Sequence, residues 1–280
     1  MEKKIKGNLF ICATPIGNLE DVSFRLIRTL KDVDVIVAED TRTTRKLLGR
    51  YEITKKDIIS YQDYSSKQKI EKICRLLQEG KSVALVSESG TPVIQDPGYK
   101  LIDNCIKKDI PLTVIPGPNA AVSALVLSGL PPDSFLFIGF LPKTKSKRKK
   151  KLGELSTIPY TLIFYESPIR LKKLLVELKK EFGDRRACIV REMSKLYEEI
   201  IRGSFSEILS KLESRKIKGE IVLVVEGYRF ELIKNYTEDD IRKKLIDLIS
   251  QNVTKKEAIK IIKSRYDIDR QRLYNISTKI

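Results

Sequence analysis

The 280-residue chain contains no histidine, and this absence excludes more chemistry than any other feature of its composition. Ser-His-Asp and Cys-His catalysis need an imidazole, and so do most zinc and iron sites. Any general acid or base must therefore be a carboxylate, a lysine, a tyrosine or a cysteine. A reaction that needs little proton transfer is favoured.

Cysteine is scarce as well. Cys12, Cys74, Cys105 and Cys188 stand singly in apolar segments and form no CxxC pair. Their spacing argues against both a zinc site and a disulfide framework. We therefore expect no bound metal and four reduced core thiols, as in a cytoplasmic protein.

Long apolar runs are missing. The first residues are basic enough to begin a secretion signal, but the apolar stretch behind them, from Leu9 to Ala13, is too short to continue one. No run approaches the roughly 20 apolar residues of a transmembrane helix. We expect a soluble protein that has no membrane partner.

Positive charge is abundant. The chain has 54 Lys and Arg against 37 Asp and Glu, a formal net charge of +17. Such an excess favours an anionic partner such as nucleic acid or a membrane surface, but lysine-rich genomes produce basic enzymes of every kind. Seven of the nine residues from Lys143 to Lys151 are basic, the densest run in the chain.

The apolar pattern predicts an α/β protein with two series of strands and helices. The first series has the pattern of a mostly parallel sheet, and the second begins after the breaker at residues 128–132. We expect domains at 1–117 and 118–228, followed by a helical accessory domain at 229–280. The predicted strands are 8–13, 34–38, 58–61, 83–87, 111–115, 135–140, 161–165, 187–191 and 221–226. A further segment, 198–201, belongs to the second series without an assigned structure. The predicted helices are 19–30, 43–48, 67–78, 97–107, 120–127, 168–182 and 206–212.

Unusual turns follow several of these strands, where an open α/β sheet binds its ligand. Proline and glycine in such turns can simply end strands and begin helices. A dinucleotide site is a second alternative, because Glu39 lies about 20 residues past the first turn. Pro15, however, removes a backbone N–H from any phosphate cradle, which disfavours a pyrophosphate ligand. The turns read TPIGN (14–18), EDTR (39–42), SGTP (89–92) with DPG (96–98), and PGPNA (116–120).

Together with FYESP (164–168) and REMSK (191–195), these motifs resemble the tetrapyrrole methylase superfamily, and within it the branch that methylates ribosomal RNA on a ribose 2′-hydroxyl. The resemblance runs from about Asn8 to Gly227. It implies a two-domain tetrapyrrole-methylase fold with the cofactor cleft between the domains, plus a small C-terminal helical domain. It further implies S-adenosylmethionine as cofactor, a homodimer, and a cytidine of small-subunit (16S) ribosomal RNA, within the small ribosomal subunit, as acceptor.

The resemblance also implies which residues bind the cofactor. Small residues at these turns let the backbone approach a nucleoside closely. Family sequences usually carry histidines in the segment after the third strand and in the motif that here reads SPIR (167–170), so no role of those histidines operates in this chain. The implied cofactor contacts are Pro15, Ser87, Gly90, Thr91, Ile94, Asn119, Ala120, Tyr165, Met193, Glu220 and Ile221.

Two carboxylates at the end of the second strand, Asp40 and Glu39, are the candidates for orienting or deprotonating the acceptor hydroxyl. An equally good interpretation is that Asp40 caps the following helix and Glu39 pairs with Arg42 or Arg45. Asp63 and Glu166 are the remaining carboxylate candidates.

Two groups of basic residues are candidates for binding RNA. Arg42 and Arg45 lie about one helical turn apart and could grip phosphate. The basic run could neutralise several more phosphates, or it could be a solvated helix or loop. The stretch 254–274 has the pattern of a helix-turn-helix accessory domain, although packing against the catalytic body would give the same pattern. The candidates in the run are Lys147, Arg148, Lys149, Lys150 and Lys151.

Two other functions stay open at this point. One is a methyltransferase of the same fold that acts on a tetrapyrrole or a protein side chain, although a small ligand such as a tetrapyrrole needs neither the basic run nor the basic tail. The other is a non-catalytic ribosome-binding relative, which the missing histidines would permit. The retained TPIGN, SGTP and PGPNA turns favour an enzyme over a binding module.

Overall fold

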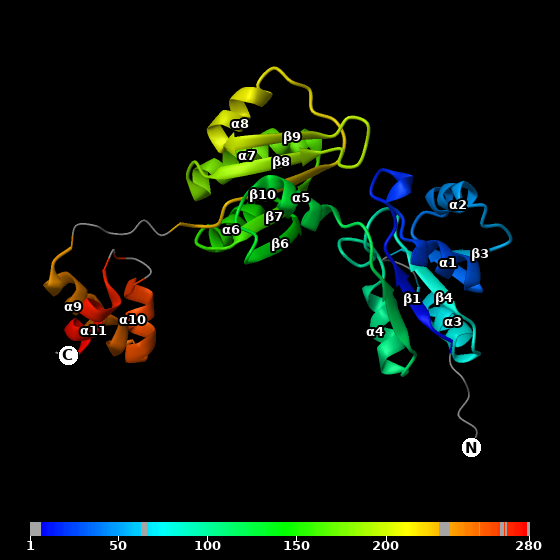
Figure 1. Ribbon diagram of the computed structural model, residues 1–280, viewed down its shortest axis with the longest axis horizontal. Coiled ribbons are helices and arrows are strands. Elements are labelled where there is room, and N and C mark those ends of the chain that lie inside the picture. Colours follow the sequence, from blue (N-terminus) through cyan, green and yellow to red (C-terminus); the bar gives the residue numbers. More distant parts are fainter. Residues whose placement is uncertain are drawn as a thin grey trace. The chain divides into compact units, whose positions relative to one another are not determined.

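The computed structural model describes residues 7–62, 66–229, 236–251, 253–263, 266 and 268–278. Contacts divide the chain into one compact unit of residues 1–156 and 160–226 and a second of residues 157–159 and 227–280. Among the described residues, the first unit contains two five-stranded sheets and the second contains three helices (Figure 1). The expected division at residue 117 falls between the two sheets, which the contacts group together.

The first sheet is parallel in all its pairs and has the strand order β3-β2-β4-β1-β5. Its central strands β2 and β4 are continuous apolar runs that are buried along their whole length, as parallel strands covered on both faces must be. The strands are β1 (Leu9–Cys12), β2 (Val35–Ala38), β3 (Asp57–Ser60), β4 (Val83–Val86) and β5 (Leu112–Ile115).

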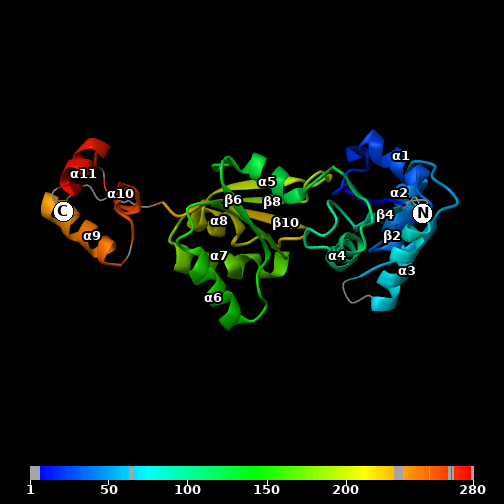
Figure 2. The same ribbon diagram turned by 90° about the horizontal axis from the view of Figure 1, so that it is seen from below.

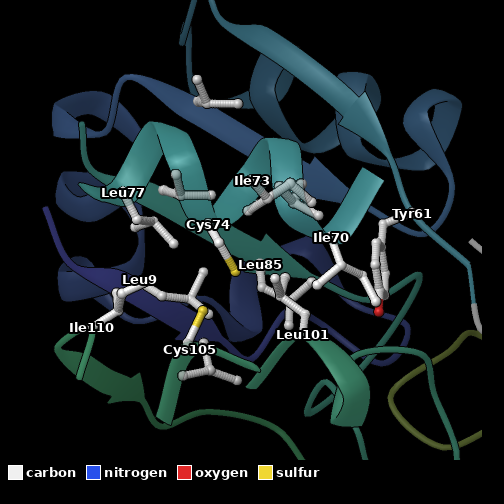
Figure 3. Close-up of a cluster of buried hydrophobic side chains, with 14 residues drawn as sticks. Leu9, Tyr61, Ile70, Ile73, Cys74, Leu77, Leu85, Leu101, Cys105 and Ile110 are labelled. Atoms are coloured by element: carbon white, nitrogen blue, oxygen red, sulfur yellow. The ribbon is translucent and has the colours of Figure 1, made fainter. Parts of the chain in front are cut away.

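Helices cover both faces of this sheet (Figure 2). The helices α1 (Phe24–Asp32) and α2 (Thr41–Arg50) pack over one face, and α3 (Lys67–Gln78) and α4 (Tyr99–Lys107) pack over the other. Figure 3 shows Cys74 of α3 and Cys105 of α4 with their sulfur atoms inside the second of these cores. All four cysteines are buried and free, as expected from their apolar settings.

The second sheet is mixed and has the order β6-β7-β10-β8-β9. Only β6 and β7 are parallel, and the other three pairs are antiparallel. The register of β6 against β7 shifts between Phe137 and Gly139. The strands are β6 (Phe135–Phe140), β7 (Thr161–Glu166), β8 (Arg186–Arg191), β9 (Glu199–Ser204) and β10 (Ile221–Val225).

Figure 2 shows α5 (Ala120–Ser128) on one side of the second sheet and α6 (Lys145–Leu155) and α7 (Pro168–Phe182) on the other. The helix α7 has the predicted bounds, because Pro168 favours a helix start and Leu171, Leu174 and Leu178 are buried at helical spacing. The last helix of this part, α8 (Phe205–Leu212), begins with a capping box at Ser204.

The structure replaces one predicted helix and defines two segments whose structure the sequence left open. The single helix predicted at 19–30 is a 3-10 turn, η1 (Leu19–Asp21), followed by α1, because Asn18 and Ser23 each cap a separate start. The basic run, left open as helix or loop, forms α6. The segment predicted only as 198–201 is a full edge strand, β9.

The second unit consists of α9 (Glu238–Ser250), α10 (Lys255–Lys263) and α11 (Arg270–Ser277). Its apolar positions form a separate core around Leu245, Ile262 and Leu273. A capping box of Thr237 and Asp240 begins α9. The helical character predicted for residues 229–280 is therefore confirmed for the described part of the tail.

Candidate functional site

The turns after β1 and β4 are joined by backbone hydrogen bonds. The N–H of Thr14 donates to the carbonyl of Gly90 at 2.8 Å, and the N–H of Gly90 donates back at 3.1 Å. The Thr91 hydroxyl donates to the carbonyl of Pro118 at 3.3 Å. The TPIGN, SGTP and PGPNA motifs therefore meet at one edge of the sheet, as the strand-end argument predicted.

The loop between β4 and α4 has an unusual backbone. Gly90 and Gly98 have φ angles of 76° and 142°, and Val93 and Gln95 have φ angles of 77° and 67°. A β-branched residue such as Val93 rarely adopts this left-handed conformation, so the surroundings must hold it there. Backbone strain of this kind is concentrated at ligand sites, which makes the loop a candidate binding element.

Two contacts connect these turns to the second sheet. The carboxamide of Gln95 lies so close to Gly139 that a Cβ added to the glycine would come within 2.4 Å of it, and its Oε1 accepts from the N–H of Phe140. Gly17 lies equally close to Lys195, with 2.6 Å between an added Cβ and Cγ of the lysine. The glycines of TPIGN and of β6 thus permit close approach of the two halves of this unit.

A cavity of about 460 Å³ lies among these elements. Its walls come from the β4–α4 loop, the start of α5, the ends of β6 and β7, and the region where β8 ends and β10 begins. Four carboxylates line it, Glu88, Asp96, Glu166 and Glu220, and no Lys or Arg is among the described residues of its lining. Such a lining suits a ligand with positive charge and disfavours one that carries phosphate.

Nine of the eleven predicted cofactor residues line this cavity. They are Gly90, Thr91, Ile94, Asn119, Ala120, Tyr165, Met193, Glu220 and Ile221. Pro15 and Ser87 do not line it. Both are buried behind the lining, where the Ser87 hydroxyl lies 3.3 Å from the carbonyl oxygens of Ser89 and Gly90 and so supports the loop instead.

Tyr165 forms an aromatic cluster with Phe137 and Phe140, whose ring centroids lie 5.0 and 5.7 Å from its own. Burial, and then the nearby Asp96 carboxylate, raises the pKa of Tyr165 above its usual value of 10.0. The phenol therefore stays neutral near pH 7 and can act as a hydrogen-bonding group, but not as a base.

The opposite wall is held by an ion-pair cluster behind Met193. The ammonium of Lys195 lies 3.0 Å from Glu192 and 3.0 Å from Glu220, and the N–H of Glu220 donates to Glu192 at 2.9 Å. The Ser194 hydroxyl donates to Asp21 at 2.7 Å. The REMSK motif thus anchors the wall to the TPIGN side of the unit.

Asp40 and Glu39, the two predicted catalytic carboxylates, do not line the cavity. Asp40 caps α2 by accepting from the N–H of Arg42 at 2.7 Å and of Thr43 at 3.3 Å, and it pairs with the Arg42 guanidinium at 2.9 Å. Hydrogen bonding from Arg42 lowers the pKa of Asp40 to about 2. Glu39 accepts from the N–H of Glu88, a residue of the cavity wall, at 3.2 Å.

Of the other two carboxylate candidates, Glu166 lines the cavity, but its Oε1 is engaged by the N–H of Ser167 at 2.6 Å and by Arg170 at 2.6 Å. Asp63 lies outside the described residues.

The predicted RNA-binding residues divide into two kinds. Arg42, Arg45, Lys147, Lys149 and Lys150 are exposed, and Lys151 is half-buried. Arg148 is the exception. It is buried, holds Glu177 through two nitrogens at 2.6 and 2.9 Å, and donates to the carbonyls of Pro142 and Lys143. Because its donors are engaged inside the protein, Arg148 anchors α6 and is no longer a candidate phosphate ligand.

The sequence prediction missed several lining residues. Asp96 belongs to the DPG motif, so a signal was present although no role was assigned to it. Ile16, Glu88 and Ser89 lie beside predicted residues in the same turns. Phe140 lines the cavity because β6 pairs with β7, and a contact that depends on strand pairing cannot be predicted from a local sequence pattern.

None of the described helices combines the length and apolar character needed to cross a bilayer. Within the described ranges, no group of three or more His, Cys, Asp or Glu side chains is arranged to hold a metal ion.

Comparison with known proteins gives one consistent answer. The sequence matches the family of tetrapyrrole (corrin/porphyrin) methylases over residues 8–209. It is 44% identical over 274 residues to the ribosomal RNA small subunit methyltransferase I of Halalkalibacterium halodurans, a match that covers 97% of this chain and 94% of the relative. The protein of the same name from Thermotoga maritima is 46% identical over 221 residues, which is 79% of this chain and 99% of the relative.

Among solved structures, uroporphyrin-III-C-methyltransferase from Thermus thermophilus superposes with a TM-score of 0.56 at 20% identity, covering 79% of this chain and 94% of that chain. At this identity the likeness supports the fold alone. With the family matched over most of its length and relatives matched along nearly all of it, the chain belongs to the tetrapyrrole methylase family, in the group of the ribosomal RNA small subunit methyltransferase I proteins.

Proposed function

We propose that this chain transfers a methyl group from S-adenosylmethionine to small-subunit ribosomal RNA, and that the acceptor is the ribose 2′-hydroxyl of a cytidine. The observation that carries the proposal is the acidic cavity enclosed by the family's motif turns. The relatives from Halalkalibacterium halodurans and Thermotoga maritima, whose matches cover 97% and 79% of this chain, are named for methylation of small-subunit ribosomal RNA.

The cavity fits the cofactor chemically. S-adenosylmethionine carries a sulfonium and an ammonium group, and when bound it supplies an electrophilic methyl group with a neutral leaving group. Glu166 is paired with Arg170 and Glu220 with Lys195, but the four carboxylates of the lining outnumber these two cations, and the remaining negative charge complements the positive groups of the cofactor. Ile94, Met193 and Ile221 offer apolar surface for a nucleoside, and backbone groups at Gly90 and Ala120 lie in the same wall.

The chain's own contribution to the reaction is chiefly positioning. The left-handed backbone at Gly90 and Val93 and the cap of α5 by Asn119, which accepts from the N–H of Val122 at 3.1 Å, fix the wall before any ligand arrives. A rigid wall that aligns the acceptor oxygen with the methyl group can supply about 7–11 kcal/mol of the rate enhancement. This mechanism requires no imidazole, which agrees with a chain that has no histidine.

We assign Asp40 and Glu39 to orienting the acceptor. With a pKa of about 2, Asp40 is a weak base but an ionised hydrogen-bond acceptor at every physiological pH. Glu39 accepts a hydrogen bond from the backbone N–H of Glu88, which lines the cavity. The pKa of Arg42 is raised chiefly by Asp40 and to a smaller extent by the Glu88 carboxylate. Glu39 thus contacts a residue of the cavity wall, and Asp40 follows it as the cap of α2, the helix that carries the exposed Arg42 and Arg45.

Assembly as a homodimer and action in the cytoplasm on the small ribosomal subunit complete the proposal. A groove of about 660 Å³ beside the cavity shares Ile16 and Met193 with it. Val126 of its wall is 76% exposed, and the nearby Leu196 is 88% exposed. Apolar surface of this kind favours a second copy as its cover. Sedimentation equilibrium tests this, and a monomer at micromolar concentration would remove the dimer.

The decisive experiment supplies methyl-labelled S-adenosylmethionine with small ribosomal subunits or 16S RNA from cells that lack the gene. We expect label in RNA, and alkaline-resistant ribose methylation at a cytidine when the product is mapped. Label in a ribosomal protein, or transfer to a tetrapyrrole only, would favour the other enzymes of this fold. If the protein binds the cofactor but methylates none of these acceptors, the chain would be a non-catalytic member of the family.

A further inference from the structure

A second, smaller cavity of about 130 Å³ lies next to the proposed cofactor cavity. It is lined by Lys143, Arg148, Glu166, Arg170, Lys173 and Leu174, and Glu166 lines the larger cavity as well. The two cavities therefore lie on either side of one residue. Their electrostatic character is opposite, because the smaller one has four cations around one carboxylate.

Two of the four cations form the framework of this cavity. Arg148 is engaged by Glu177 and by two backbone carbonyls. Arg170 holds Glu166, whose side chain is only 2% exposed, through Nε at 2.7 Å and Nη2 at 2.6 Å. Its Nη1 has no acceptor among the described residues, so the guanidinium keeps donors for a ligand.

The other two cations are uncommitted. Lys143 and Lys173 are exposed at the mouth of the cavity, and within the described ranges neither ammonium forms an ion pair. They come from the loop before α6 and from α7, so the fold, not the sequence, brings them together. Two unpaired ammonium groups and a planar guanidinium around a small cavity are the donor set that binds a tetrahedral oxyanion.

The surface around the cavity points to a polymer as the source of that anion. The exposed Lys147, Lys149 and Lys150 belong to α6, which begins two residues after Lys143, and they add further positive charge to the same segment of the chain. A free anion needs one site, whereas a nucleic acid backbone presents phosphates along such a surface.

We propose that the cavity lined by Lys143, Arg170 and Lys173 binds a backbone phosphate of the substrate RNA and thereby places the adjacent ribose at the methyl donor; this rests on the proposed function. Phosphate contacts fix the register of a bound strand without reading its bases. The shared Glu166 sets the separation between the phosphate and the methyl donor. The cavity thus acts as a positioning site for the acceptor.

The test removes the two uncommitted charges with the double variant Lys143→Gln/Lys173→Gln. Because neither side chain forms an ion pair within the described ranges, the variant should fold normally and bind S-adenosylmethionine with unchanged Kd. The kcat/KM for 16S RNA should fall roughly 5- to 10-fold near 0.1 M salt, and the log-log salt slope of RNA binding should become shallower by about 0.7–0.9 for one lost phosphate contact. Arg170 is left intact, because its loss would strand the buried Glu166 carboxylate.

The matched control is Lys67→Gln/Lys72→Gln, which removes the same charge from exposed positions of α3. We expect it to change kcat/KM less than about twofold. A second comparison, Lys143→Arg/Lys173→Arg, keeps both charges and should retain the wild-type slope. Equal slopes in the Gln variant and the wild type would overturn the phosphate site.

Inorganic phosphate at constant ionic strength separates the two sources of the anion. Competition against RNA in the wild type, but not in the Gln variant, supports a site that takes the RNA backbone. Phosphate binding that leaves the KM for RNA unchanged assigns the cavity to free phosphate and overturns the RNA assignment. If the wild type itself labels no RNA, the proposed function fails; if it does and only the Lys143/Lys173 effect is missing, this inference alone fails.

Discussion

Gly90 and Ala120 both line the cofactor cavity, but they differ in backbone conformation and therefore in what a substitution tests. Gly90 has a φ of 76°, and an added Cβ would come within 3.3 Å of Ile16. Any side chain there costs about 1–2 kcal/mol of stability in addition to blocking the cavity. Ala120 is the first residue of α5, where leucine is well tolerated by a helix.

We therefore predict that Ala120→Leu weakens binding of S-adenosylmethionine by roughly 10- to 100-fold, the equivalent of the 1–3 kcal/mol typical of overpacking, with little change in Tm. Isothermal titration measures the affinity. Val176→Leu enlarges an exposed residue of α7 outside this cavity and outside the proposed dimer groove, and should bind normally. An Ala120→Leu variant with wild-type affinity would place the cofactor elsewhere.

Substitution of Asp40 by asparagine separates its two roles, because asparagine can cap α2 but cannot supply the negative charge that orients the acceptor. Asparagine is as good a helix cap as aspartate, so Asp40→Asn should leave folding and cofactor affinity nearly unchanged. It removes the ionised acceptor that orients the ribose hydroxyl, and we expect kcat to fall by about 10²-fold, the loss that a misplaced reacting group produces. Full turnover by this variant would make Asp40 a helix cap only.

The pKa of Asp40 also predicts a pH dependence. Since this pKa is lowered to about 2, its ionised form is stabilised by folding, and the benefit is present above pH 3.8 and lost as the pH falls through about 2. The profile of kcat/KM between pH 5 and 8 should therefore show no step from Asp40. A step in this range that disappears in Asp40→Asn would contradict the assigned pKa.

At the scale of elements, α6 combines a structural arginine with exposed lysines. Arg148→Ala should lower the free energy of unfolding by about 2–4 kcal/mol, somewhat less than a fully buried pair, because Glu177 keeps 24% exposure. The neighbouring Lys147→Ala should change it by less than about 0.5 kcal/mol. Urea denaturation measures both, and equal stabilities would mean that the ion pair does not hold α6.

This ion pair has a defined pH window. Hydrogen bonding from Arg148 lowers the pKa of Glu177 below its usual 4.5, so its stabilisation is complete above about pH 4.5 and is lost as the pH falls through the lowered pKa. The difference between the wild type and Arg148→Ala should therefore shrink in acid.

The same elements show how far the sequence alone could lead. Local signals sufficed for α7, which has a proline start and apolar residues at helical spacing, and for the turns that gather at the first sheet's edge. They did not separate Arg148 from its lysine neighbours, because its burial depends on Glu177, 29 residues away. The contact of Gln95 with Gly139 and the basic cavity are likewise products of tertiary pairing, which no periodicity encodes.

At the scale of the whole molecule, negative and positive charge are concentrated in different segments of the chain. The cofactor cavity is acidic, whereas the excess of positive charge in the chain lies elsewhere, partly on α6 and partly in the tail. From Glu231 to the end the tail has 12 Lys and Arg against 8 Asp and Glu. Because the two kinds of charge belong to different segments, one chain can attract an RNA polyanion and hold a cationic cofactor at once.

The tail can therefore be removed to separate these roles. Its three helices have their own core, and the Thermotoga maritima relative is covered to 99% by a match of 221 residues, 79% of this chain. We predict that truncation after Arg229 leaves the first unit folded and the Kd for S-adenosylmethionine within about twofold of the full chain.

Because the tail's net excess is only four positive charges, RNA affinity should fall modestly, and the salt slope should become shallower by no more than about 3, at 0.7 per phosphate released. Fluorescence-monitored unfolding and RNA binding at several salt concentrations measure these quantities. Loss of cofactor binding on truncation would show that the tail supports the catalytic unit, whereas an unchanged salt slope would show that its positive charge does not contact RNA.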